Sequence, residues 1–450
     1  MSLILSSKAV TSSAALGHSL STLASVPTQT YTLTAFLSIR GKKSNPIATG
    51  ESIVEYMNET TRKFGIDKKI EFRHKVVSAD WRSSEQRWRL EVENEGRRKV
   101  YWAKFAIMGT GYYDYEKPLK ADIPGLERFQ GTRVHPQFWP EDLDYRGKKM
   151  VVIGSGATAV TILPAVVEKG VGSIVQLQRS PGYIFNMPQQ KPEDPLPYWQ
   201  RILPRWITLR LLRFQYIIGP YVIWILCRTF PNLMRSFFRS EAKKALPKGF
   251  PIDPHLQPKY NPWDQRLCYI PDNDFFKAFE TGRARIVTDT IKSVVEDGIE
   301  LDSGEKLEAD IISVAASPLT MDGELVHVPD CYTWRTTMLS GVPNLGIIIG
   351  YVNASWTLGA DSASRLIVRL YKYMEDNGYT NATPVISDEE KKDPVQVLNL
   401  KSTYVKAGNM NVPHAGRTGP WKPREHYFQD SWIANRGDLH EGLVFGTVTT

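Results

Sequence analysis

The sequence predicts an α/β fold of interleaved domains, at least one of them Rossmann-like. The stretch "MVVIGSGATA" (Met150 to Ala159) has the composition of a buried strand that runs into a glycine turn and a helix. Strand-like segments lie before and after it, and no internal repeat or long low-complexity linker divides the 450-residue chain. These observations predict a dinucleotide-binding strand, turn and helix inside a larger α/β protein.

The composition is that of an ordinary globular protein. Hydrophobic residues make up 42% and charged residues 23% of the chain. The sequence contains no run of about 18 apolar residues, which is the length that a membrane span needs. The net charge of +8 suits nucleic acid, a membrane surface or an anionic cofactor and does not choose among them. The chain has neither a nucleic-acid-binding motif nor a GxSxG elbow, so we expect no nucleic-acid partner and disfavour a hydrolase.

Cysteine usage argues against cross-links and metal sites. Cys227, Cys268 and Cys331 are far apart, odd in number and without CxxC spacing. We therefore expect no disulfide framework and no metal site. A reducing compartment, the cytoplasm, is the simplest inference.

The local patterns place β-rich segments on both sides of the glycine turn. Ser52 to Ile66 has a helical apolar period, and the segments "KIEFRHKVVSADW", "RWRLEVENEG" and "VYWAKFAIMGTG" alternate as strands do. After the turn, "GSIVQLQRSP" is typical of the second strand of a βαβ unit. Strands return at "RARIVTDTIKSVVEDGIEL" and "EADIISVAA", and a strand, turn and long helix follow from "VPNLGIIIGYVNASWTL".

Residues 195–250 are expected to be helical, aromatic and basic. Between Arg201 and Lys248 there are ten Lys or Arg and one acid, Glu241. Within this part, "YIIGPYVIWILC" (Tyr216 to Cys227) is apolar on all faces, but at about a dozen residues it is too short to span a bilayer. We expect a buried helix, and a peripheral membrane contact through 201–248 is the alternative.

The turn has the spacing GxGxxA. Gly154 allows the tight turn, Gly156 lets the backbone approach a pyrophosphate, and the small Ala159 lets helix and strand pack closely. The alternative is a glycine turn without a ligand. The cofactor contacts predicted here are Gly154, Ser155, Gly156, Ala157, Thr158 and Ala159.

The end of the next strand indicates which dinucleotide is bound. NAD enzymes usually carry an acid there for the ribose 2′-hydroxyl, whereas this chain has Gln178, Arg179 and Ser180. An arginine and a hydroxyl suit a 2′-phosphate, so NADP is favoured. A surface arginine beside a strand end is the alternative for Arg179.

A longer motif precedes the glycine turn and carries a family resemblance. The stretch "FQGTRVHPQFWP" matches F-x-G-x(3)-H-x(3)-W-P in full. The matching residues are Phe129, Gly131, His135, Trp139 and Pro140. The stretch resembles the fingerprint of type I Baeyer–Villiger monooxygenases within the flavin-containing monooxygenases, and the related N-oxygenating enzymes usually lack its Trp-Pro ending. The segments "HKVVSADW", "YNPWDQRLC" and "GLVFG" resemble the branch that includes the ethionamide-activating monooxygenase, and the similarity runs from about Tyr31 to Phe445.

The resemblance implies two interleaved dinucleotide-binding (Rossmann-like) domains, one for FAD and one for NADPH, joined by the fingerprint. The FAD domain is expected at 31–145 and 308–450, and the NADP domain at 146–307 with a helical subdomain at 195–260. Residues 1–30 are expected to be an unstructured leader. The fingerprint His135 is expected to position chain and cofactor, and Trp139 to share this role or to pack in the core.

The resemblance also implies a reaction and its residues. One atom of O₂ would be inserted into a ketone or aldehyde through a flavin C4a-peroxide, giving an ester or lactone, with thioether oxidation as another outcome. Arg266 matches the catalytic arginine that stabilises the peroxide, although a salt bridge with Asp264 or Asp272 is the alternative. The implied cofactor contacts are Gln265 near the NADP phosphate, Trp356 beside the nicotinamide and substrate unless it is core, and Val76, Gly109 and Gly111 near the FAD adenine.

The sequence departs from the family pattern at the flavin site. Residues 1–30 contain no first GxGxxG, and the acid that would pair with the arginine is replaced by Pro27 to Thr30. The family's ATG motif is also missing after "ADIISVAA". We therefore expect an incomplete FAD domain. A non-catalytic, truncated remnant that retains NADP binding is the alternative function.

Overall fold

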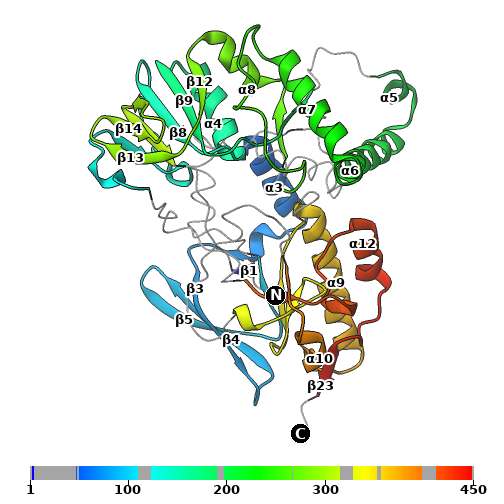
Figure 1. The fold of residues 1–450 in the computed structure, drawn as a ribbon. Helices are drawn as coiled ribbons and strands as arrows, with labels where there is room; N and C mark the ends of the chain where they lie inside the picture. The colour runs from blue at the N-terminus through cyan, green and yellow to red at the C-terminus, as the bar shows by residue number, and fades with distance from the viewer. Residues whose placement is uncertain are drawn as a thin grey trace. The chain divides into compact units, whose positions relative to one another are not determined.

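The computed structural model describes residues 3–4, 47, 50–109, 123–189, 197–265, 267–314, 328–351, 356–397 and 412–447. The chain forms two compact units (Figure 1). The first unit comprises Met1–Thr11, Arg62–Tyr115 and Pro318–Thr450, and the second comprises Ser12–Thr61 and Glu116–Ser317. These limits differ from the predicted 146–307 because strands on both sides of that range pair into the sheet of the second unit.

The second unit is built on a five-stranded sheet in which every pair is parallel. Its strands, in spatial order, are β12 (Ala284–Thr288), β9 (Ser173–Gln178), β8 (Lys149–Ile153), β16 (Ile311–Val314) and β7 (Thr132–Val134). From β8 the chain moves outward through β9 to β12 and then crosses to β16 on the other side of β8. This reversal is the topology of a Rossmann-like sheet, which places a ligand site at the carboxyl end of β8.

Both faces of this sheet are buried, which explains the continuous apolar run of β8. Met150 and Val152 face a core shared with helix α4 (Ala157–Glu168) and α8 (Asp274–Lys277), and Val151 faces the opposite core. That second core is closed by the antiparallel strands β13 (Ile291–Val295), β14 (Gly298–Leu301) and β15 (Lys306–Glu308). A strand buried on both faces needs apolar side chains at successive positions.

The fingerprint belongs to this sheet. Phe129 is buried in the core behind β8, and β7 follows it as the edge strand. His135 then caps the short helix η3 (Pro136–Phe138), its Nδ1 accepting from the backbone N–H of Gln137 at 3.3 Å. Trp139 packs edge-on against Tyr145, with ring centroids 6.2 Å apart. The stretch predicted to join two domains therefore also forms one wall of the second unit.

A helical part follows β10 (Ile184–Met187) in the second unit. It consists of α5 (Tyr198–Ile202), α6 (Arg205–Thr229) and α7 (Pro231–Ala245) (Figure 1). Helices were expected in residues 195–250, but the expectation that Tyr216 to Cys227 forms a buried helix was wrong. Helix α6 has 25 residues, and it alone among the described helices is long and apolar enough by composition to cross a membrane, with none of its apolar 18-residue window buried.

Among the described residues, the first unit is built on a three-stranded sheet, a four-stranded sheet and two packed helices, with two-stranded pairs beside them. Strands β3 (Lys75–Arg82), β4 (Arg87–Asn94) and β5 (Arg97–Ala103) form an antiparallel sheet, as their alternation predicts. Strand β6 (Ala106–Met108) pairs in parallel with β19 (Leu345–Ile347), which continues through β18 (Met338–Leu339) to β17 (Thr333–Trp334). Helix α9 (Trp356–Asp376) follows this sheet and packs on α12 (Tyr427–Arg436) around Trp334 and Trp421.

The remaining elements are short. Helix α3 spans Gly50–Lys63, and the division of the chain into units falls within it, after Thr61. The others are β1 (Leu3–Ile4), η1 (Asp67–Lys69), β2 (Ile70–Glu71), η2 (Leu126–Arg128), β11 (Cys268–Pro271), η4 (Ala278–Thr281), η5 (Val328–Asp330), β20 (Asn381–Pro384), α10 (Asp388–Lys391), β21 (Val395–Gln396), β22 (His414–Ala415), η7 (Gly419–Trp421) and β23 (Leu443–Gly446). The pairing of β1 with β2 corrects the expectation of an unstructured leader for Leu3 and Ile4, and residues 5–30 lie outside the described residues.

Gly131 provides a test of whether the fingerprint contributes to the stability of the second unit. A Cβ at this position would lie 2.4 Å from the carbonyl oxygen of Asp310 and 2.5 Å from the ring of Phe129. We expect Gly131→Ala to lower the free energy of unfolding by about 1–3 kcal/mol, because the backbone of the edge strand must move away. The measurement is the urea midpoint of the second unit's unfolding transition.

The matched control is Gly219→Ala, where an added Cβ meets nothing within 4 Å and the site lies inside α6. It should leave the midpoint unchanged or raise it, because alanine favours the helix. An unchanged midpoint for Gly131→Ala would show that the edge strand contributes nothing to the stability of the unit.

Candidate nucleotide-binding site

The glycine turn has the geometry that a pyrophosphate needs. Gly154 has a φ of 133°, a conformation that favours glycine, and its N–H donates to the carbonyl of Leu177 in the neighbouring strand at 2.8 Å. Gly156 caps α4, and a Cβ there would meet nothing within 4 Å. Ala159 is fully buried, as close packing of helix and strand requires. The turn thus leaves open space beside Gly156, the residue directly before α4.

The electrostatics at this end of α4 favour an anion. The first turn of the helix contains no acidic residue, so its unpaired N–H groups and the positive end of its dipole are not neutralised from within the helix. Ser155 is half-buried, and its hydroxyl donates to the carbonyl of Ser180 at 2.8 Å. This bond ties the turn to the end of β9, where the 2′-phosphate contacts are predicted. The described residues here fit the pyrophosphate of a dinucleotide.

Gln178 has a structural role that the sequence did not predict. It is 3% exposed, and its Nε2 donates to the carbonyl of His255 at 2.7 Å and to Thr288 Oγ1 at 3.0 Å. Its Oε1 accepts from Gln176 Nε2 at 3.2 Å. The side chain therefore joins β9, β12 and the segment after α7. Arg179 is exposed and Ser180 is half-buried, so these two are better placed than Gln178 for contact with a ligand.

His255 and Thr288 are members of this site that sequence reasoning missed. His255 Nδ1 lies 2.9 Å from Thr288 Oγ1, at the carboxyl ends of β9 and β12. Burial lowers the pKa of His255, so the neutral ring predominates at pH 7. No local motif signals this pair, because the two residues are 33 positions apart and meet where the segment after α7 lies against the ends of β9 and β12.

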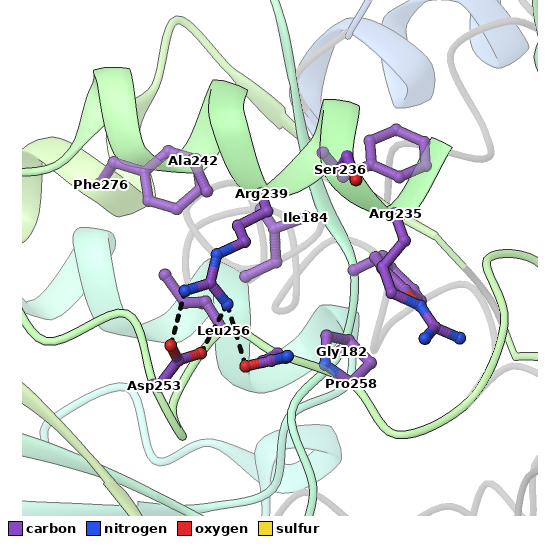
Figure 2. Close-up of a pocket in the computed structure, with 13 residues that line it drawn as sticks. Gly182, Ile184, Arg235, Ser236, Arg239, Ala242, Asp253, Leu256, Pro258 and Phe276 are labelled. Carbon is purple, nitrogen blue, oxygen red and sulfur yellow. Dashed lines mark hydrogen bonds and ion pairs between the residues drawn. The ribbon is translucent and has the colours of Figure 1, made fainter. Parts of the chain in front are cut away.

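A cavity of about 330 Å³ lies beside the turn (Figure 2). Gly182 lines it, and a Cβ on this glycine would lie 3.2 Å from the carbonyl oxygen of Ser155. Across the cavity, Arg239 of α7 makes a bidentate ion pair with Asp253, with Nη1 to Oδ1 at 2.6 Å, and also donates to Gln257 at 2.9 Å. This arginine holds the pKa of Asp253 below its usual range. The pair fixes the segment that carries His255 to α7.

The other predicted site residues are divided between the units. Gln265 is half-buried in the second unit. In the first unit, Val76 is 43% exposed on β3, and Gly109 is exposed after β6. Arg266 and Gly111 lie outside the described residues.

Trp356 begins α9 and is half-buried. A Cβ on Gly350 would lie 2.4 Å from its ring, so the ring covers the turn that follows β19. A ring that packs on the backbone in this way fits the alternative role for Trp356, which is packing in the core. Among the described residues, no three His, Cys, Asp or Glu side chains are grouped so that they could hold a metal ion.

Comparisons with known proteins agree with this arrangement. The family model for flavin-binding monooxygenase-like proteins matches residues 44–188. The FAD-containing monooxygenase EthA of Mycolicibacterium smegmatis is 41% identical over 393 residues, which cover 85% of this chain and 79% of that protein. EthA of Mycobacterium tuberculosis is 38% identical over 414 residues, covering 89% and 83%, and the probable FAD-binding monooxygenase AlmA of Acinetobacter baylyi is 36% identical, covering 89% and 82%.

Solved structures show the same fold at lower identity. OTEMO in complex with FAD and NADP has a TM-score of 0.64 at 16% identity, covering 93% of this chain and 89% of that one. Oxidized steroid monooxygenase bound to NADP has a TM-score of 0.64 at 17% identity, covering 91% and 87%.

Gly156→Ala separates folding from binding at the turn. Because the space for a methyl group is open, the variant should keep the wild-type melting temperature. The methyl group should keep a pyrophosphate from the backbone, so the Kd for NADP⁺ should rise at least about tenfold, measured by isothermal titration calorimetry. Gly219→Ala is the control and should bind NADP⁺ as the wild type does. An unaltered Kd for Gly156→Ala would place the dinucleotide elsewhere.

Arg179→Gln tests the preference for NADP. Loss of the guanidinium should raise the Kd for NADP⁺ about tenfold and leave that for NAD⁺ nearly unchanged, because only NADP⁺ carries the 2′-phosphate. The control is Arg133→Gln, another exposed arginine of the second unit. Equal losses for both nucleotides would assign Arg179 a role outside 2′-phosphate recognition.

Proposed function

The chain belongs to the family of flavin-binding, FAD-containing monooxygenases, and from this premise we propose that it performs oxygen insertion of the Baeyer–Villiger type. It is an enzyme, an FAD-containing monooxygenase. The proposed nicotinamide cofactor is NADP. The proposed substrate is a small ketone or aldehyde, converted with O₂ to an ester or lactone. A thioether, oxidised to a sulfoxide, is a second substrate class within the same proposal.

The observation that carries the proposal is the complete fingerprint. All its fixed residues are present, including the Trp139–Pro140 ending that the N-oxygenating relatives usually lack. The packing of Phe129 and Trp139 on either side of β7 indicates that the fingerprint residues have a structural role. The solved neighbours include a cyclohexanone monooxygenase from Rhodococcus bound to NADP⁺, but at 16% identity that likeness concerns the fold alone.

The residues of the second unit have definite proposed tasks toward the nicotinamide nucleotide. The N–H groups at the start of α4 would bind the pyrophosphate, which approaches over Gly156, and Arg179 with Ser180 would bind the 2′-phosphate. Gln178 and His255 hold the strand end that carries these two residues. The ring of His255 is neutral at pH 7, so the positive charge offered to the phosphate comes from Arg179.

The flavin part of the proposal rests on family membership. The first unit contains the parallel pair of β6 and β19, and the ring of Trp356 lies against Gly350, three residues after β19. FAD, when bound, supplies the chemistry that passes electrons from NADPH to O₂. We propose that Arg266 stabilises the negative charge that develops on the reacting oxygen, since a guanidinium stays charged when water is excluded.

We propose a cytoplasmic, reducing location for the protein. Cys227, Cys268 and Cys331 are free and buried, and burial raises the pKa of the Cys227 thiol to about 11, which keeps it protonated and unreactive. Any contact with a membrane would be peripheral, made by part of the second unit.

Product analysis tests the reaction. The purified protein with FAD, NADPH and ¹⁸O₂ should convert a ketone to an ester that contains one ¹⁸O atom, detected by mass spectrometry. Arg266→Ala should lower the rate about 10²–10³-fold while NADP⁺ binding is retained. Arg283→Ala, at an exposed arginine of the second unit, should leave the rate unchanged.

Each other outcome corrects a specific part of the proposal. Sulfoxide without ester would restrict the activity to thioethers. Full activity in Arg266→Ala would remove that residue from catalysis. Absence of bound flavin, with no NADPH oxidation after FAD is added, would leave NADP binding as the activity of this polypeptide.

A further inference from the structure

Helix α6 is apolar on two opposite faces, of which only one is used by the fold. Tyr216, Ile223 and Cys227 pack in a core shared with Phe238 of α7. Phe214 on the other side of the helix is 59% exposed. A helix of a monomeric globular unit needs one apolar stripe, so a second one indicates a further partner.

The exposed apolar side chains continue onto both neighbouring helices, which pack against α6 (Figure 1). We call this set the α5–α7 apolar surface. It consists of Tyr198, Ile202, Trp206, Leu211, Phe214, Val222, Ile225, Phe230, Leu233 and Phe237, each between 40% and 75% exposed. Exposed apolar side chains are ordinary when single, but a group of this size on adjoining helices marks an interaction site.

The charged residues of α5 and α6 are all of one sign. The segment from Tyr198 to Thr229 contains five arginines and no Asp or Glu. Arg210 lies over the ring of Trp206, with the guanidinium carbon 5.2 Å from the ring centroid. Aromatic rings beside arginines are typical of helices that lie at a membrane interface, where the ring enters the headgroup region and the cation meets lipid phosphates.

We propose that the α5–α7 apolar surface docks on the surface of a bilayer that contains anionic lipid. Two observations favour this partner over others. A two-fold interface with a second copy would bring the arginines of both copies together, and no acid in the segment compensates them. Insertion of α6 across the bilayer would pull Cys227, which is 1% exposed, out of the core of its unit. A helix with one face held by the protein and one bare apolar face lies in the interface plane.

Flotation of the full-length protein with lipid vesicles tests the proposal. The protein should float with phosphatidylcholine vesicles that contain phosphatidylglycerol at low salt, float weakly with pure phosphatidylcholine, and be released in part by high salt. Failure to float at low salt, or equal binding to both vesicle types, would overturn the proposal.

Variants separate the apolar and the electrostatic contributions. Phe214→Gln with Leu233→Gln should lower the bound fraction at least about tenfold, because both side chains leave the acyl boundary. Phe64→Gln, at a phenylalanine 55% exposed in the first unit, is the matched control and should bind as the wild type does. Arg201→Gln with Arg205→Gln should weaken binding to the anionic vesicles about fivefold per arginine and leave the weak binding to phosphatidylcholine unchanged.

Fluorescence quenching of the wild-type protein distinguishes a lipid bilayer from a second copy of the chain as the partner of this surface. Brominated lipids should quench part of the tryptophan fluorescence of the wild type, and Trp206→Phe should lose that part. A dimer in sedimentation that Phe214→Gln with Leu233→Gln disperses, without quenching by lipid, would assign the surface to a second copy instead.

Discussion

The confinement of β8 on four sides is the constraint on which the candidate nucleotide-binding site depends. The strand pairs with β9 on one edge and β16 on the other, and Met150, Val151 and Val152 are at most 1% exposed. A strand held by two hydrogen-bonded neighbours and two apolar layers cannot shift register, because a slip of one residue would exchange its faces. The position of Gly154 and the start of α4 follow directly from this confinement. The hydrogen bonds from Gly154 to Leu177 and from Ser155 to Ser180 then fix the end of β9 relative to the turn.

Local patterns predicted the parts of the fold that depend on neighbouring residues. The buried strand, the glycine turn and α4 were expected from ten consecutive residues, and the alternation of β3 and β4 was read in the same way. The contacts of Gln178 could not be predicted, because His255 is 77 and Thr288 110 positions away. Pairing of the fingerprint strand with β16 is also a long-range event. A motif specifies residue types, whereas the partner of an edge strand depends on the whole topology.

The bounds of α6 within the helical stretch 195–250 were not predicted, for a local reason. The apolar run from Tyr216 to Cys227 is short, and Gly219 and Pro220 in its middle suggest a break. The helix nevertheless extends N-terminally to Arg205 and keeps Pro220 inside it. Arginine lowers hydropathy but favours the helix, so a search for apolar runs stops where the helix continues. For the candidate site, the turn and the strand end were predicted as groups. That Gln178 is buried and Arg179 exposed could be seen only in the structure.

The position of β16 also determines when the sheet of the second unit can be completed during synthesis. This strand lies between β7 and β8 in the sheet, although it is made after both of them, and every strand of the sheet except β16 has left the ribosome before it. Until then β7 has no partner among the described strands, and one edge of β8 stays open. The fingerprint strand β7 therefore stays unpaired until the last strand, β16, inserts between β7 and β8. Such late, long-range closure is slow and leaves unpaired edges open to association with other chains. A nascent chain of this protein is most exposed to aggregation in the interval before β16 is complete.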